Sequence, residues 1–349
     1  MHAADTMRAW RVHRAGSPLE ALQLDRIERP QPGPGEVRVA AVAAPLNFNE
    51  IDGCRGRYLT VSPPLPYTLG MEVVGTVDAV GAGAEQWLGK RVTACARGAF
   101  GGYADRVIAD AGMVFDAPAS LDDTHAAAFF FPFHLAYLGL HVRGQLQAGE
   151  TVLVHAGAGG VGSAAIQLAK AAGARVIATA GGADKLALCR ELGAELAIDY
   201  RSEAFDAAVL QATAGRGVDV VFDGVGGAVT QRSLRCMAFG ARLLMIGFAG
   251  GVEAEDSANL TPRPLLFGSF ALVGVLLAYT ANPLYENPAP GIRLAPRSLG
   301  ERIHVALLAL LEQGQIRPIV GKTVTFAELP QALSAMEDRR TIGRTVVTF

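Results

Sequence analysis

The stretch from Thr151 to Thr179 constrains the fold more than any other part of the sequence. Thr151–His155 is a short apolar and β-branched run, which is typical of a buried parallel strand. The next five residues are all alanine or glycine, and from Val161 apolar residues recur at helical spacing as far as Gly173. A second apolar run, Arg175–Thr179, follows almost at once. A strand, a tight turn, a helix and another strand make a βαβ unit, so the sequence predicts a parallel sheet.

The turn of this unit carries the spacing Gly-x-Gly-x-x-Gly, at Gly157, Gly159 and Gly162. In a chain with 41 glycines the spacing alone would be weak, but here a strand precedes it and a helix follows it. We expect Gly157 to permit the tight turn, Gly159 to let the backbone approach a pyrophosphate, and Gly162 to let the helix pack close to the strand. The N–H groups at the helix N-terminus would bind the phosphates, so the motif predicts a dinucleotide-binding site.

The same alternation of strands and helices continues as far as Gly247. It predicts an α/β fold with a doubly wound parallel sheet and helices on both faces. One more strand is expected at Phe270–Leu277. The other elements expected here are the strands Glu195–Asp199, Val218–Phe222 and Arg242–Ile246, and helices that begin near Val161, Ala183, Glu203 and Ala228.

The first part of the chain has a different pattern, with short β-branched runs separated by glycine and proline. This pattern predicts a β-rich, barrel-like domain. A segment rich in proline and asparagine, Asn282–Gly291, is the best candidate for a loop or lid. The strands expected in the first part are Met7–His13, Glu36–Val42, Met71–Val80, Lys90–Ala96 and Tyr103–Ala109. Toward the C-terminus we expect the helices Leu299–Gln313 and Leu329–Glu337 and the strands Thr323–Phe326 and Thr345–Thr348.

Length and charge limit the possible classes of function. The 349 residues are enough for two domains, and a formal net charge of −2 gives no reason to expect nucleic acid or a membrane as partner. Two uncharged stretches, 124–142 and 265–278, are too interrupted or too short for a membrane span of about 20 apolar residues. The N-terminus has no apolar signal segment and the cysteines lie far apart, so we expect a protein of the reducing cytoplasm. The cysteines are Cys54, Cys95, Cys189 and Cys236.

Further motifs are spread along nearly the whole chain. They are Pro32–Glu36, Leu46–Glu50, Arg55–Tyr58, Leu69–Glu72, Gly101–Tyr103, Gly149–Gly162, Leu192–Ala194, Ile198–Tyr200, Phe222–Gly227, and Gly240 with Ile246–Gly247. Together they resemble the medium-chain dehydrogenase/reductase superfamily, in particular its zinc-free quinone oxidoreductase branch. The resemblance implies a Rossmann domain, residues 129–285, inserted in a GroES-like catalytic domain, residues 1–128 plus 286–349, with the active site in the cleft between them.

The resemblance also bears on metal binding. Zinc-dependent relatives carry Gly-His-Glu where this chain has Gly70, Met71 and Glu72, and they have a lobe with four closely spaced cysteines that this sequence lacks. Cys54 falls close to the position of a zinc-ligand cysteine. A catalytic zinc needs about three protein ligands, so we expect no metal site and interpret Met71 as a core residue.

The end of the second predicted strand indicates which dinucleotide binds. NAD sites usually place a carboxylate there, but this strand ends in Thr179–Gly182, and the first acid, Asp184, is explained equally well as a helix cap. A 2′-phosphate carries a charge of about −1.5 to −2. A carboxylate ~4 Å away would repel each unit of that charge by roughly 4 kcal/mol at an effective dielectric constant of 20. The missing carboxylate and the nearby Lys185 therefore favour NADPH, although Lys185 could also be an ordinary solvated lysine.

The resemblance implies the residues that bind this cofactor. Lys185 and Tyr200 match positions that touch the 2′-phosphate, Gly181 lets the phosphate approach, and Arg344 matches a basic residue that reaches the cofactor. The full expected set is Ala156, Gly157, Gly159, Gly160, Val161, Gly162, Gly181, Lys185, Tyr200, Val225, Gly247, Phe248 and Arg344.

Without a metal ion, hydride transfer suits an acceptor that is already electron-poor, such as a quinone or an α,β-unsaturated carbonyl. In the family, positions matching Asn47 and Tyr58 line the nicotinamide and acceptor sites, and either side chain could donate a hydrogen bond to the developing oxyanion. The usual threonine of the family is Pro132 here, which leaves His134 as a possible acid–base group. A loop-capping Asn47, a packed Tyr58 and a core His134 are the structural alternatives.

Two other functions stay open. One is an enoyl thioester (acyl-CoA) reductase. The other is an NADPH-binding relative without enzymatic activity, including RNA binding, although the sequence has no basic patch. Family members commonly pair through the last strand of the cofactor sheet, here Phe270–Leu277, so a homodimer is expected. The physiological acceptor and the proton donor are not specified by the sequence.

Overall fold

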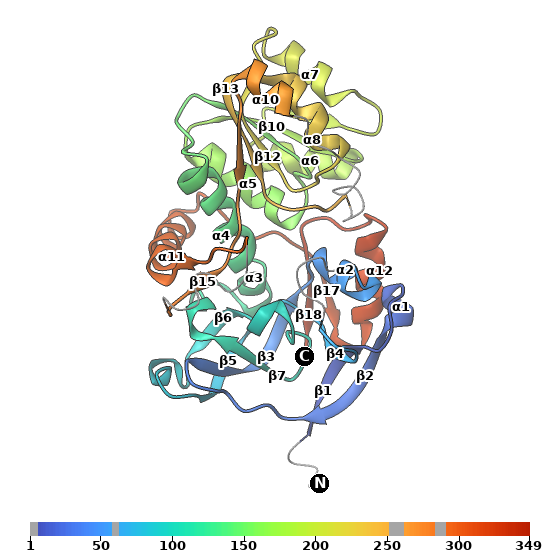
Figure 1. Ribbon diagram of the computed structural model, residues 1–349, viewed down its shortest axis with the longest axis vertical. Coiled ribbons are helices and arrows are strands. Elements are labelled where there is room, and N and C mark those ends of the chain that lie inside the picture. The colour runs from blue at the N-terminus through green and yellow to red at the C-terminus, as the bar shows by residue number, and fades with distance from the viewer. Residues whose placement is uncertain (1–5, 58–62, 251–261, 283–290) are drawn as a thin grey trace. The chain divides into compact units, whose positions relative to one another are not determined.

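The computed structural model of the chain describes residues 6–57, 63–250, 262–282 and 291–349 (Figure 1). They form two compact units. Unit 1 comprises the described parts of Met1–Phe130, Ala278–Val305 and Pro318–Phe349. Unit 2 comprises those of Phe131–Leu277 and Ala306–Arg317.

Two differences between the units and the predicted domains exceed two residues. The break after Leu277 comes earlier than the predicted one at 285, and residues 306–317 join unit 2 although the prediction assigned them to the first domain. Hydrogen bonds explain the second difference. The N–H of Arg317 donates to Gln167 Oε1 at 2.8 Å, and Gln167 Nε2 donates to the carbonyl of Arg317 at 3.0 Å. This pair attaches the segment to a helix of unit 2.

Unit 2 contains the predicted parallel sheet. Its six strands lie in the order β11-β10-β9-β12-β13-β14, and all neighbouring pairs are parallel. Val152, Leu153 and Val154 in the central strand are fully buried, which explains the uninterrupted apolar run in the sequence. The strands are β9 (Thr151–Val154), β10 (Arg175–Ala180), β11 (Leu196–Asp199), β12 (Val218–Asp223), β13 (Met237–Met245) and β14 (Ala271–Gly274).

Helices connect these strands and cover both faces of the sheet (Figure 1). α5 contacts α6 and β10, whereas Phe205 and Val209 of α7 pack with Leu153 and the other residues of one apolar cluster. Right-handed crossovers place α5 and α6 on one face and α7 on the other, because the chain reverses direction along the sheet after β11. The helices are α4 (Phe130–Tyr137), α5 (Gly160–Ala171), α6 (Ala183–Leu192), α7 (Phe205–Ala212), α8 (Ala228–Ser233) and α10 (Pro262–Gly268).

Two predicted elements of unit 2 were too long or began too early. The strand expected at Phe270–Leu277 is confined to Ala271–Gly274, because its partner β13 ends at Met245. The helix expected near Glu203 begins at Phe205. The N–H groups of Ser202 and Glu203 donate to the carbonyl of Asp199, so these residues form a turn.

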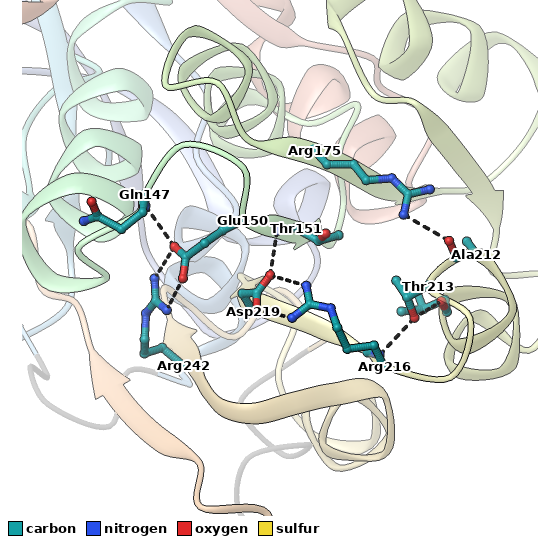
Figure 2. A network of polar contacts seen from close by, with 11 residues as sticks. Gln147, Glu150, Thr151, Arg175, Ala212, Thr213, Arg216, Asp219 and Arg242 are labelled. Atoms are coloured by element: carbon teal, nitrogen blue, oxygen red, sulfur yellow. Dashed lines mark hydrogen bonds and ion pairs between the residues drawn. The ribbon is translucent and has the colours of Figure 1, made fainter.

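A network of charged side chains lies at the amino-terminal ends of the central strands (Figure 2). Arg242 donates from both Nη atoms to Glu150 at 2.7 Å, and Arg216 donates to Asp219 at 2.8 and 2.6 Å. Asp219 also accepts from the N–H of Thr151 at 2.8 Å. These ion pairs lie at the amino ends of the strands. The glycine-rich loops lie at the opposite, carboxyl ends, where open α/β sheets bind ligands.

Unit 1 is β-rich, as the GroES-like pattern predicted. A seven-stranded sheet has the order β17-β18-β3-β5-β6-β8 with β7 paired to β3, and a three-stranded sheet has the order β2-β1-β4. The main strands and helices of its first part are β1 (Thr6–Val12), α1 (Pro18–Ala21), β2 (Leu22–Glu28), β3 (Glu36–Pro45), α2 (Asn49–Arg55), β4 (Tyr67–Thr68), β5 (Glu72–Val80), β6 (Arg91–Cys95), β7 (Arg106–Asp110), β8 (Val114–Asp116) and α3 (Asp123–Ala127). The later elements are β15 (Tyr279–Thr280), β16 (Ala295–Pro296), the first part of α11 (Arg297–Glu312), β17 (Val320–Thr325), α12 (Leu329–Glu337) and β18 (Arg344–Thr348).

Some expectations fall partly or wholly outside the described residues. Of the loop or lid predicted at Asn282–Gly291, only the two end residues are described, and the candidate acceptor residue Tyr58 is not described. Among the helices that the structure does describe, none has both the length and the apolar character needed to cross a membrane.

Candidate functional site

The glycine-rich turn of unit 2 joins β9 to α5 in the predicted place. Ala156 adopts a left-handed conformation with φ of 51°, and Gly159 is the extended residue that precedes α5. A Cβ on Gly162 would lie 2.2 Å from the carbonyl oxygen of Ala156. Only glycine at 162 therefore lets α5 begin this close to the turn.

Gly157 is needed for a different reason from the predicted one. The left-handed conformation in this turn belongs to Ala156, and Gly157 does not have a positive φ. A Cβ on Gly157 would lie 2.9 Å from Cys189 Sγ and 3.0 Å from Ala178 Cβ. The residue is thus required because the turn packs directly on α6 and β10.

The N-terminus of α5 has no side-chain cap. The first N–H groups of a helix have no partner within the helix, and here no side chain caps them. They belong to Gly160, Val161 and Gly162, which the sequence assigned to the cofactor. Backbone donors at a helix N-terminus, next to a turn of small residues, fit a pyrophosphate.

The glycine-rich turn and the start of α5 are the first part of the candidate cofactor site, which we call the cradle. The loops that follow β12 and β13 form its second part. Asp223 is buried and accepts from the N–H groups of Val225 at 2.8 Å and Gly226 at 3.1 Å. The two loops are joined because the N–H of Gly250 donates to the carbonyl of Val225 at 2.8 Å. A Cβ on Gly226 would lie 3.1 Å from Phe248. The structure thus brings Val225 and Phe248, together with Gly247, to one loop pair at the carboxyl edge of the sheet.

The ends of β10 and β11 make the third part. Gly181 follows β10, and a Cβ there would lie 3.0 Å from the hydroxyl oxygen of Tyr200 and 2.6 Å from Arg201 Nε. Lys185 lies in the first turn of α6. Gly181, Lys185 and Tyr200 were predicted from the sequence, whereas Arg201 was missed although it directly follows the Ile198–Tyr200 motif.

His155 links the elements below the cradle. Its Nδ1 lies 2.9 Å from Thr179 Oγ1 and its Nε2 lies 2.8 Å from Ser233 Oγ. Burial lowers the pKa of the imidazole below its usual value of 6.5. The residue is therefore a neutral hydrogen-bonding link between β9, β10 and α8.

Asn47 lies in unit 1 in a cluster of buried charged groups. Arg344 Nη1 donates to Asn47 Oδ1 at 2.9 Å, and Arg344 Nη2 donates to Glu72 Oε1 at 2.5 Å. Asn47 and Arg344 are each 5% exposed and Glu72 is 1% exposed. The predicted acceptor residue and the predicted cofactor residue are thus in direct contact. The contact of Arg344 with the cofactor stays a prediction.

Glu50 holds the other side of Asn47. Its carboxylate accepts from the N–H groups of Asn47 at 2.8 Å and Met71 at 2.9 Å, and from the hydroxyl of Tyr103. Burial raises the pKa of Glu50 to about 7, and the two N–H donors and Tyr103 offset part of that rise. Glu50 thus bonds three separate segments of the chain and fixes the loop that carries Asn47.

The other described side chains that the sequence analysis considered for catalysis or metal binding are buried. His134 lies in α4, is 0% exposed, and belongs to unit 2 rather than to the unit of Asn47. Cys54 is also fully buried, and burial raises the pKa of its thiol to about 12, which makes it an unreactive thiol. Met71 is buried, as expected, with its sulfur 3.6 Å from Asn49 Nδ2. Within the described ranges, no group of three or more His, Cys, Asp or Glu side chains is arranged to hold a metal ion.

Comparisons with known proteins agree with this architecture. Residues 33–119 match the alcohol dehydrogenase GroES-like domain, and residues 160–287 match the family model described as zinc-binding dehydrogenase. A quinone oxidoreductase of Pseudomonas aeruginosa is 35% identical over 94% of this chain and 95% of its own length. The chain belongs to the medium-chain dehydrogenase/reductase superfamily. Within it, the chain falls in the zinc-free quinone oxidoreductase branch.

The chain is also similar to a solved structure and to parts of much longer proteins. Mycobacterial Rv1454c, solved in complex with NADPH, is 30% identical with a TM-score of 0.84, over 98% of this chain and all of that one. A mycocerosic acid synthase-like polyketide synthase of Mycobacterium tuberculosis is 39% identical over 66% of this chain. The chain spans only 11% of that synthase, and a similarly small share of the other synthases that it matches.

Glu50 gives this member of the superfamily a testable pH dependence of stability. Between its unfolded pKa near 4.5 and its folded pKa near 7, the folded protein holds a proton that the unfolded chain has lost. The contribution of Glu50 to the free energy of unfolding is therefore largest below pH 4.5. It falls by about 3 kcal/mol as the pH rises through 7. Urea unfolding at pH 4.5 and pH 8 should show wild type losing this much stability relative to Glu50→Gln.

The matched control for this experiment is Glu203→Gln, since Glu203 is exposed. The stability of that variant relative to wild type should change little between the two pH values. A constant difference between wild type and Glu50→Gln across the range would contradict the raised pKa of Glu50.

Proposed function

We propose that this oxidoreductase transfers a hydride from NADPH to a quinone or an α,β-unsaturated carbonyl without a metal ion. The observation that carries the proposal is the end of β10. The residues that end this strand carry no carboxylate of their own, Arg201 from the segment after β11 lies beside Gly181, and Lys185 lies in the first turn of α6. The NADPH complex of mycobacterial Rv1454c and the similarity to a quinone oxidoreductase support it.

NADPH, when bound, supplies the hydride. The chain's own groups bind and orient: the N–H groups at the start of α5 take the pyrophosphate, and the loops at Val225 and Phe248 flank it. Gly181, Lys185 and Tyr200 receive the 2′-phosphate end. Arg344 is proposed to reach the cofactor from unit 1.

Asn47 is the proposed group that acts on the acceptor. Arg344 carries only donors, so the Asn47 atom that it contacts is the carbonyl oxygen and the amide Nδ2 points elsewhere. Nδ2 is 3.5 Å from Glu50 Oε1, which is a weak contact and leaves its hydrogens available. A donor held in this way stabilises negative charge on the acceptor oxygen as the hydride arrives. Tyr58 is a second proposed hydrogen-bond donor to the acceptor, and His134 is a proposed acid–base group.

The first test is NADPH oxidation by the purified full-length chain with four acceptors, each repeated with NADH. The acceptors are 1,4-benzoquinone, 9,10-phenanthrenequinone, an aliphatic enone and crotonyl-CoA. We expect turnover with a quinone or the enone and a preference for NADPH. Tight NADPH binding without turnover of any acceptor would contradict the proposed reaction and favour the binding-protein alternative.

The second test removes the proposed oxyanion donor. Loss of one such donor typically lowers kcat by about 10²–10³-fold, so Asn47→Ala should lower kcat by roughly that factor while the Kd of NADPH changes little. Asn49→Ala is the matched control, because the side chain of this neighbouring residue hydrogen-bonds to the sulfur of Met71 and not to Arg344 or Glu50. A kcat for Asn47→Ala within threefold of wild type would show that Asn47 has no role in the reaction.

An enoyl thioester reductase is the second candidate function. The similarity to part of a mycocerosic acid synthase-like polyketide synthase favours it. Crotonyl-CoA in the acceptor series distinguishes the two, since a thioester reductase should turn it over faster than either quinone.

We also propose that the activity belongs to the cytoplasm. All four cysteines are free thiols and are buried. Such thiols suit a reducing compartment. Mass spectrometry of the native protein from cells should find all four unmodified, and disulfide-linked peptides would contradict this location.

A homodimer through β14 is part of the proposal. β14 is the last strand in the order of its sheet, so its outer edge has no partner strand among the described residues. Apolar side chains next to it are exposed, with Phe267 at 79% and Leu276 at 54%. An apolar edge strand of this kind needs cover, and a second copy of the chain provides it.

Light scattering on the eluting protein should give the mass of a dimer for wild type. Leu272→Glu puts a charge on β14 and should shift the mass toward the monomer. Leu88→Glu changes a similarly exposed leucine of unit 1 and should leave the dimer intact. A monomeric wild type at tens of micromolar would rule out this interface.

A further inference from the structure

The sheet order places the ends of two strands side by side. β10 and β11 are parallel neighbours, and Ala180 of β10 is paired with Asp199 of β11. The residues that directly follow, Gly181 on one strand and Tyr200 and Arg201 on the other, therefore leave the sheet at the same edge. This is the carboxyl edge that also carries the glycine-rich turn.

The side chain of Arg201 covers Gly181. A Cβ added to Gly181 would lie 2.6 Å from Arg201 Nε and 3.0 Å from Arg201 Cζ, and one added to Gly182 would lie 3.6 Å from Nη1. The guanidinium thus lies over the two glycines that follow β10. Arg201 is exposed, and its side chain makes no hydrogen bond or ion pair within the described part of the chain.

The carboxylate of Asp199, two residues before Arg201, bonds backbone groups and forms no ion pair with this guanidinium. Asp199 accepts from the backbone N–H groups of Gly182 at 3.1 Å and of Arg201 at 3.0 Å. It therefore ties the two loops together and fixes the backbone from which the Arg201 side chain starts. The five N–H donors of the guanidinium remain available.

We propose that Arg201 binds the 2′-phosphate of NADPH and is thereby a determinant of the choice of NADPH over NADH. The inference rests on the proposed NADPH-dependent function and adds to it a phosphate-binding residue that the sequence analysis did not identify. A guanidinium presents a planar fork of donors that matches two phosphate oxygens, whereas the ammonium of Lys185 acts as a point charge. Arg201 from β11 and Lys185 from α6 would then hold the phosphate over Gly181.

Two nucleotides that differ only in the 2′-phosphate test this directly. Calorimetric titration of the full-length protein with 2′,5′-ADP and with 5′-AMP measures what that phosphate contributes to binding. Arg201→Gln removes charge-assisted hydrogen bonds to the phosphate and should weaken 2′,5′-ADP binding by about 10–100-fold. The Kd of 5′-AMP should change by less than about threefold, and the ratio of kcat/KM for NADPH and NADH should fall with the 2′,5′-ADP affinity.

Two further variants separate charge from geometry. Arg201→Lys keeps the charge but loses the fork, so it should retain only part of the 2′,5′-ADP affinity. Arg190→Gln removes an equal charge in the last turn of α6, away from Gly181, and should leave both affinities unchanged.

The outcomes distinguish this inference from the proposed function. If wild type binds 2′,5′-ADP at least tenfold tighter than 5′-AMP and Arg201→Gln keeps that ratio, the role of Arg201 is overturned while NADPH specificity stands. If wild type binds the two nucleotides equally, the proposed NADPH preference fails and the role of Arg201 fails with it.

Discussion

The close approach of α5 to the glycine-rich turn is the constraint on which unit 2 depends. With the Ala156 carbonyl only 2.2 Å from where a Cβ of residue 162 would be, any other side chain there would push the helix away from the turn. The helix would then no longer direct its first N–H groups at the space beside the turn, and phosphate binding would lose its donors. The same turn packs on Cys189 and Ala178, so the proposed phosphate site depends on the contact between β9, β10 and α6.

Unit 1 depends on a different kind of interaction, a set of charges kept out of water. Arg344 and Glu72 form an ion pair at 2.5 Å with almost no exposed side-chain surface. Such a pair is a weak source of stability, because desolvation offsets most of its attraction. It does impose direction, since Arg344 is a donor only and orients the carboxamide of Asn47. Glu50 fixes the backbone at Asn47. The buried charges thus add little to stability, but they hold the Asn47 carboxamide in a single orientation.

The sequence predicted the fold better than the roles of single residues. Strands such as β9 and β10 are buried on both faces, so their apolar runs can be recognised without knowledge of their neighbours. The limits of β14 and α7 depended on contacts outside each segment, with the end of β13 and with the carbonyl of Asp199. Local sequence does not contain these contacts. The assignment of residues 306–317 to unit 2 likewise depends on Gln167, which is 150 positions away from Arg317.

In the candidate site, too, features set by neighbouring residues could be predicted from the sequence, and features set by distant residues could not. Glycines 157, 159 and 162 form a local pattern and were all found, but the packing role of Gly157 involves Cys189 on another helix. Arg344 and Asn47 are 297 positions apart, so no spacing could reveal that one orients the other.

Arg201 is an intermediate case. The usual test for the 2′-phosphate looks for charge at the end of the second strand, and that position here contains only small residues. In a parallel sheet, however, the carboxyl ends of adjacent strands share one edge. A cation that follows the third strand can therefore occupy the same space, and the glycines after the second strand leave that space open.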